Sequence, residues 1–206
     1  TDQILEEYIN AIRYVANPIE KNYAHITIRG PYSAPIDVTE LNKIIANKEI
    51  KITSIDTFFN DKQNTVWLRC SSESLKQIWS KPDYDFNPHI TLYDGSSRSF
   101  AEKLRLVLNS HLINFSFKVD RLYELRSIKG QIDYKLFLDT KADYINRVIG
   151  KDIKKGIVEK MTDEERLFII RELTYFLTLY KSKRKLNVTL YDEYKDKNYN
   201  LDVLRD

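Results

Sequence analysis

The stretch AHITIRG at residues 24–30 returns in altered form as PHITLYDG at residues 88–95. Two of the chain's three histidines therefore stand in the same tripeptide, His-Ile-Thr. With typical residue usage, a given histidine is followed by Ile-Thr by chance well under about one time in a hundred. Because an internal repeat is expected to repeat its special residues at the same structural place, the two stretches indicate a chain with two similar halves.

Each half shows the same order of predicted elements, strand, helix, strand and strand. In the first half these elements span residues 24–30, 37–47, 50–59 and 64–70. In the second half they span residues 88–94, 99–109, 114–127 and 132–140. A linking helix is predicted over residues 72–79. The spacing of Asp37 with Glu40 predicts an N-terminal cap for the first of the repeated helices, and Ser99 with Glu102 predicts a capping box for the second.

Two amphipathic helices are predicted outside the repeat. Residues 1–15 carry apolar side chains at helical spacing, and residues 162–185 do the same after a capping box of Thr162 and Glu165. The C-terminal helix is expected to pack on the repeated halves as an extra layer. The alternative is a surface for a protein partner, or a lid.

The composition limits the class of protein. A chain of 206 residues, 42% of them hydrophobic, can bury a substantial core. The net charge of +3, with both signs interspersed, permits a phosphate-bearing ligand but does not favour duplex DNA. The single Cys70 excludes an intramolecular disulfide and a cysteine-built zinc site, and we expect it to pack in the core. With no leader at Thr1 and no apolar run of about 18 residues, we expect a cytoplasmic protein without membrane contact.

The polar side chains of each His-Ile-Thr stretch are expected to share one strand face, because alternate residues of a strand point the same way. In the first stretch this face carries His25, Thr27 and Arg29. In the second stretch it carries His89, Thr91 and Tyr93. The opposite, apolar face carries Ile26, Ile28, Ile90 and Leu92.

The paired motif resembles the 2H phosphoesterases, a family named for two His-x-Thr/Ser-x motifs on pseudo-symmetric lobes. This family includes the bacterial 2′-5′ RNA ligase-like proteins and the cyclic phosphodiesterases. The resemblance covers about residues 22–140, and the later segment FKVDRLYELRS followed by DYKLFL is similar to the end of the family's second lobe. The opening helix differs from the first strand that many members carry, and residues 141–206 have no recognised counterpart.

The resemblance implies an α+β fold of two β-α-β-β lobes, about residues 22–70 and 86–140, whose antiparallel sheets face a central groove. An N-terminal helix and a mostly helical extension over residues 141–206 would complete a domain spanning residues 1–140. It also implies that His25 and His89 act as catalytic acid and base, while Thr27 and Thr91 bind the non-bridging phosphate oxygens. Histidine suits both roles because it titrates near neutral pH, and no metal or cofactor is then required. The sequence leaves open which histidine is the base.

Four further residues are candidates for substrate binding. Arg29 is placed to meet a phosphate, and an exposed, solvated charge is the equal alternative. Tyrosine can stack on a nucleobase, although packing is the default role for each of Tyr32, Tyr93 and Tyr134. His111 has no threonine at the motif spacing, so we interpret it as structural or exposed.

Two functions of different classes remain. The first is a phosphodiesterase that acts on RNA or a nucleotide, through a 2′,3′-cyclic phosphate, a 2′-5′ linkage or a cyclic or linear oligonucleotide. The second is a non-catalytic module that binds a nucleotide or RNA end for sensing or sequestration. Both His-x-Thr motifs are intact, which favours the enzyme.

Overall fold

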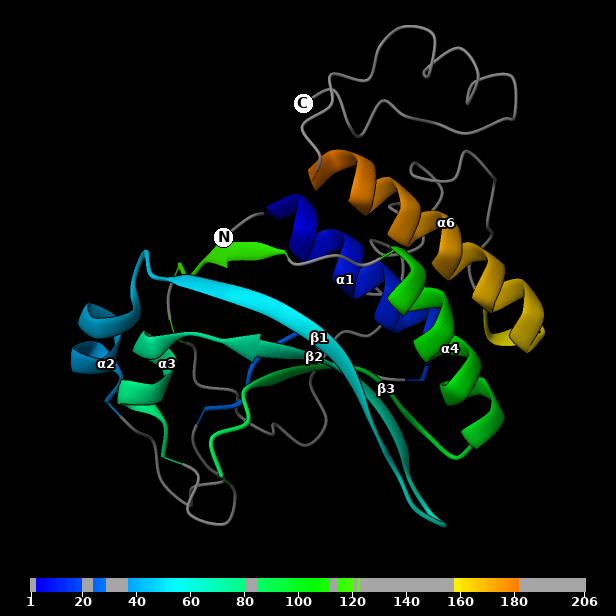
Figure 1. Ribbon diagram of the computed structural model, residues 1–206, viewed down its shortest axis with the longest axis horizontal. Helices are drawn as coiled ribbons and strands as arrows, with labels where there is room; N and C mark the ends of the chain where they lie inside the picture. The colour runs from blue at the N-terminus through cyan, green and yellow to red at the C-terminus, as the bar shows by residue number, and fades with distance from the viewer. Residues whose placement is uncertain are drawn as a thin grey trace, which may run out of the picture.

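The two longest strands that the structure describes form the centre of an antiparallel sheet. β1 (Glu49–Phe59) pairs with β2 (Asn64–Ser71), and both strands curl in the computed structural model (Figure 1). β3 (His89–Gly95) pairs with β2, and β4 (Ser116–Lys118) pairs with β1, which gives the strand order β3-β2-β1-β4. The structure describes residues 3–19, 24–28, 37–80, 85–111, 115–120, 122 and 158–181.

Both predicted halves thus contribute strands to one sheet. The prediction placed the strands of each half in a sheet of its own, whereas β3 and β4 of the second half flank β1 and β2 of the first. The ladder between β1 and β4 extends on both sides, because the Asn47 N–H donates to the Val119 carbonyl at 2.8 Å and the Ile52 N–H donates to the Phe115 carbonyl at 2.6 Å. The predicted strand over residues 132–140, and most of residues 121–127, lie outside the described residues.

One face of the sheet is apolar. Along β2 the side chains of Val66, Leu68 and Cys70 are buried in strict alternation with more exposed neighbours. In β1 the alternation shifts after Ile52, because Thr53 is an extra residue between two register partners of β2. This β-bulge returns Ile55 to the buried face.

A second bulge changes the predicted faces of β3. Thr91 lies opposite Trp67 and Tyr93 lies opposite Val66, so Leu92 is the extra residue. The insertion moves Tyr93 to the buried face, where it is 7% exposed. The predicted sharing of one polar face therefore ends at Thr91, and Tyr93 belongs to the core.

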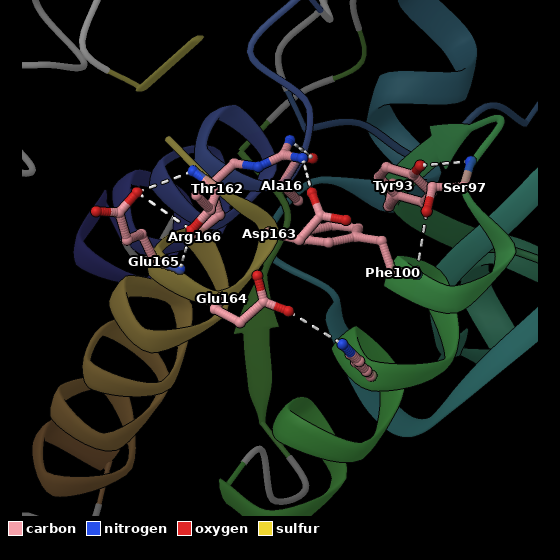
Figure 2. Close-up of polar contacts among 10 residues, drawn as sticks. Ala16, Tyr93, Ser97, Phe100, Thr162, Asp163, Glu164, Glu165 and Arg166 are labelled. Atoms are coloured by element: carbon pink, nitrogen blue, oxygen red, sulfur yellow. Dashed lines mark hydrogen bonds and ion pairs between the residues drawn. The ribbon is translucent and has the colours of Figure 1, made fainter. Parts of the chain in front are cut away.

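Tyr93 joins the sheet to the first turn of the next helix (Figure 2). Its hydroxyl accepts a hydrogen bond from the Ser97 N–H at 3.2 Å, and its ring centroid lies 5.1 Å from that of Phe100. Burial raises the pKa of the Tyr93 hydroxyl above its usual value. The ring also covers Gly95, where any β-carbon would collide with the tyrosine hydroxyl, so glycine is required by close approach.

Two helices cover the apolar face of the sheet, and a third helix packs on those two. They are α1 (Gln3–Ala16), α4 (Arg98–His111) and α6 (Asp163–Lys181). α4 packs on β1, β2 and β3, α1 packs on β3, and α6 packs on both α1 and α4 (Figure 1). The side chains of these helices that join the core include Tyr8, Ile12, Phe100, Leu104, Leu108, Ile170, Leu173 and Leu177. The predicted first helix is confirmed, and the C-terminal helix packs as an extra layer.

The start of α6 is anchored by Arg166 (Figure 2). One terminal nitrogen of its guanidinium donates to the Ala16 carbonyl, the last residue of α1, at 3.1 Å. The guanidinium carbon lies 4.6 Å from the centroid of the Phe100 ring, and the other terminal nitrogen pairs with Asp163. One arginine thereby joins α6 to both α1 and α4.

The helix caps agree with the sequence pattern in part. The capping box of α6 is confirmed, with the Thr162 hydroxyl accepting from the Glu165 N–H at 3.2 Å and the Glu165 carboxylate accepting from the Thr162 N–H at 2.9 Å. In α4 the predicted cap is wrong. The helix begins one residue before Ser99, and the Ser97 hydroxyl accepts from the Phe100 N–H at 3.2 Å. Tyr93 fixes the backbone of Ser97, which places the cap there.

Three shorter elements complete the described chain. α2 (Thr39–Ile45) and α3 (Glu73–Ile78) pack against each other beside the sheet (Figure 1), and η1 (Val158–Lys160) precedes α6. At α2 the Asp37 carboxylate is hydrogen-bonded by the side chain of Thr39 and by its N–H, the latter at 2.9 Å, and these bonds lower the pKa of that carboxyl. The predicted pairing of Asp37 with Glu40 is absent, because Glu40 pairs with Lys43 instead.

The two caps proposed for α4 can be compared by mutation. Ser97→Ala removes a capping hydroxyl and should lower the free energy of unfolding by about 1 kcal/mol. Ser99→Ala, the matched control, changes an exposed side chain within the helix and should stay within about 0.5 kcal/mol of the parent. Urea denaturation followed by circular dichroism measures both. Equal losses would contradict the assignment of Ser97 as the cap.

The burial of Cys70 predicts an unreactive thiol. Burial raises its pKa to about 12, and the side chain is 3% exposed. Because the thiolate is the nucleophile, Ellman's reagent at pH 8 should not react with the folded protein on the time scale of seconds in which it reacts with a free thiol. After unfolding in urea, one thiol per chain should react with the reagent. Rapid full reaction without denaturant would show that the pocket around Cys70 is open.

Candidate functional site

The sheet face opposite the helices carries the second His-Ile-Thr motif. Because Ile90 and Leu68 point into the core, their neighbours along β3 and β2 point the other way. Arg69 is the register partner of His89, and Trp67 is the register partner of Thr91. The next strand, β1, adds Asp56 opposite Trp67. These five residues, His89, Thr91, Trp67, Arg69 and Asp56, form what we call the outer-face cluster.

His89 is held in one orientation. Its Nδ1 lies 2.8 Å from the Asn87 carbonyl oxygen, which can only accept, so this nitrogen carries a proton. The Trp67 ring packs beside the imidazole with centroids 5.7 Å apart. Within the described part of the chain, Nε2 of His89 makes no hydrogen bond. In the neutral ring this nitrogen is the basic one, and it can exchange a proton with a ligand.

Thr91 is fixed through its backbone. The strand β3 ends the described sheet, and its outer edge is bound by one side chain of α1 and by one that directly follows this helix. The Arg13 guanidinium, 3% exposed, donates to the Thr91 carbonyl, and the Asn17 amide donates to the Asp94 carbonyl at 3.0 Å. The half-buried Thr91 side chain then lies on the outer face, on the same side of the strand as His89.

The first motif lies in residues 24–28, which form no helix or strand, so the strand predicted there is wrong for these residues. The alternation of faces persists, because Ile26 and Ile28 pack against the core while Thr27 is exposed and His25 is half-buried. The segment is tied at its far end, where the Ile28 carbonyl accepts from the Ser80 N–H at 3.2 Å.

One turn of α1 holds both motifs. The Asn10 side chain, 6% exposed, accepts from the Ala24 N–H at 2.7 Å, directly before His25. Arg13, three residues further along α1, binds the Thr91 carbonyl. Residues three apart lie on the same face of a helix, about 5–6 Å apart at their β-carbons. The backbones of the two His-Ile-Thr stretches are therefore bound to neighbouring side chains of one helix.

The other predicted binding residues are placed differently. Tyr93 lies in the core, away from the outer-face cluster. Arg29, Tyr32 and Tyr134 lie outside the described residues. His111 is the last residue of α4.

Three members of the outer-face cluster were not predicted. Trp67, Arg69 and Asp56 come from β1 and β2, and only the register between strands places them beside His89 and Thr91. The alternation along β2 was the available signal, since Trp67 and Arg69 occupy its non-apolar positions. The indole Nε1 of Trp67 and Oδ1 of Asn87 are buried and have no hydrogen-bond partner within the described part of the chain.

Two searches of the described residues found nothing. No group of three or more His, Cys, Asp or Glu side chains in this part of the chain is arranged to hold a metal ion. None of the helices described is both long enough and apolar enough to span a membrane.

Comparison with known proteins adds no identification. We found no matching protein-family model, no significant match among curated proteins and none among solved structures.

Proposed function

We propose that the chain is a metal-independent phosphodiesterase that uses its two His-x-Thr motifs on an RNA end or a nucleotide. The candidate bonds are a 2′,3′-cyclic phosphate, a 2′-5′ linkage or a linkage in a cyclic or linear oligonucleotide. In this proposal the two motifs belong to pseudo-symmetric lobes and face one groove.

The observation that carries the proposal is the binding of both motifs to one turn of α1. Asn10 binds the backbone next to His25, and Arg13 binds the backbone of Thr91. Two histidines that share one phosphorus must come from stretches that lie close together, and this pair of buried contacts supports such an arrangement.

The orientation of His89 supports a role in proton transfer. Its Nδ1 donates to the Asn87 carbonyl, which fixes the tautomer and leaves Nε2 to act on the substrate. One imidazole would take the proton of the attacking water or hydroxyl as the new P–O bond forms. The other would give a proton to the leaving oxygen as the old P–O bond breaks. The Thr27 and Thr91 hydroxyls would donate to the non-bridging oxygens, where charge increases in the transition state.

The alternative is a module that binds nucleotide without turnover. A panel of nucleoside 2′,3′-cyclic phosphates and 2′-5′-linked dinucleotides, incubated with the protein and a chelator, decides between the two. Turnover would establish the enzyme and exclude a required metal. Tight binding with no product would establish the module. The absence of both binding and turnover would contradict both functions.

The histidines should matter most for turnover. His25→Ala and His89→Ala should each lower kcat by roughly 10²- to 10⁴-fold, the usual contribution of a general acid or base. Initial rates on the best substrate of the panel measure the effect. His111→Ala is the matched control, because His111 stands outside both motifs, and it should keep the parent rate. A His89→Ala variant with most of its activity would remove that residue from the mechanism.

The threonines should matter less, because each supplies one hydrogen bond. Thr27→Val and Thr91→Val keep the branched shape and remove the hydroxyl, and each should lower kcat by at most roughly 10²- to 10³-fold. The affinity for a nucleoside monophosphate separates ground-state from transition-state binding. Thr57→Val, a strand threonine outside the motifs, is the control. Full activity in both motif variants would exclude the two hydroxyls from the mechanism.

A further inference from the structure

The outer-face cluster holds a cation directly across the strand pair from His89. Arg69 and His89 are register partners in the antiparallel ladder of β2 and β3. Such partners place their β-carbons about 4.5–5.5 Å apart on the same face of a sheet. A guanidinium at this position can reach an anion that touches the imidazole.

The Arg69 guanidinium is only partly used within the protein. Its Nε donates to the Asp56 carboxylate at 2.5 Å, and the two side chains are 51% and 30% exposed. Within the residues that the structure describes, the terminal nitrogens of Arg69 make no hydrogen bond. They offer a planar pair of donors, which matches two oxygens of a phosphate.

The alternative is that Arg69 and Asp56 form an ordinary surface ion pair with no binding role. That alternative accounts for their contact but not for the groups that lie next to it. Exposed pairs contribute little to stability, with a median near 0–1 kcal/mol. This pair lies beside a histidine of fixed tautomer, a half-buried threonine and a tryptophan with an unpartnered indole N–H in the described part of the chain. The imidazole and the threonine hydroxyl are suited to a polar ligand.

We propose that Arg69 binds the phosphate of the nucleotide substrate beside His89, and that Asp56 is a positioning residue that holds the guanidinium in place. The inference rests on the proposed function, because it assigns a phosphate contact to the same site. It adds two residues that come from neither His-x-Thr stretch.

Equilibrium binding tests the phosphate contact without requiring turnover. Calorimetric titration of the full chain with adenosine 2′-monophosphate, and with adenosine as the probe that lacks phosphate, separates the two contributions. Arg69→Gln should weaken nucleotide binding by roughly 10- to 100-fold, the range for a lost hydrogen bond to a charged group, and leave adenosine unchanged. Arg69→Lys keeps the charge without the planar donors and should lose part of the affinity.

Arg98→Gln is the matched control. Arg98 also pairs with a carboxylate, Glu102, at 3.0 Å and is exposed, but it lies in α4 on the helical side of the sheet. Its substitution should leave the affinity for the nucleotide unchanged. Unaltered binding in Arg69→Gln, or an equal loss in Arg98→Gln, would overturn the phosphate contact.

The role of Asp56 is tested by a double-mutant cycle. Asp56→Asn should weaken nucleotide binding less than Arg69→Gln does, and the double variant should lose no more than Arg69→Gln alone, because Asp56 acts only through the arginine. On a substrate that is turned over, Asp56→Asn should raise KM and preserve kcat. Additive losses in the double variant would overturn the positioning role.

The outcomes for the parent protein separate this inference from the proposed function. Binding that depends on Arg69, without turnover of any substrate in the panel, would contradict the phosphodiesterase and leave the phosphate site established. Turnover that is unaffected by Arg69→Gln would establish the enzyme and overturn the site. Failure of the parent chain to bind the nucleotide would overturn the phosphate site, and the turnover panel would still decide the proposed function.

Discussion

Two buried polar side chains on α1 constrain the rest of the described structure. Asn10 and Arg13 are 6% and 3% exposed, and buried polar groups are costly unless they are hydrogen-bonded. Their contacts go to the backbone at Ala24 and Thr91, in the two stretches that share the His-Ile-Thr motif. A helix that would otherwise be an apolar cover for the sheet thus sets the position of both stretches.

The bulge at Leu92 then decides what the second stretch presents. Before the bulge, His89 and Thr91 point to the outer face, whereas Tyr93 after it points into the core. There its ring and hydroxyl fix Phe100 and Ser97 at the start of α4. One extra residue therefore separates the part of β3 that points to the outer face from the part that holds the helical layer.

The features that the sequence predicted are those with a local cause. Helical spacing located α1 and α6, and the pair Thr162 and Glu165 forms the predicted capping box. The features that it missed depend on distant partners. The bulge at Leu92 exists only relative to β2, Tyr93 moves the cap of α4 from Ser99 to Ser97, and the neighbours of His89 are set by strand register. In the candidate site, the repeated tripeptide was enough to predict the motif residues. Arg69 and Trp67 could be placed there only from the pairing of β2 with β3.

The two long helices that lie outside the predicted repeat, α1 and α6, are packed against each other. α6 buries Leu173 and Leu177 in the shared core, and Arg166 binds the Ala16 carbonyl at the end of α1. Since α1 is the element that holds both His-Ile-Thr stretches, α6 supports the candidate site from a distance. Because α1 is apolar on more than the side that packs on β3, it needs a second layer to cover the rest, and α6 provides that layer.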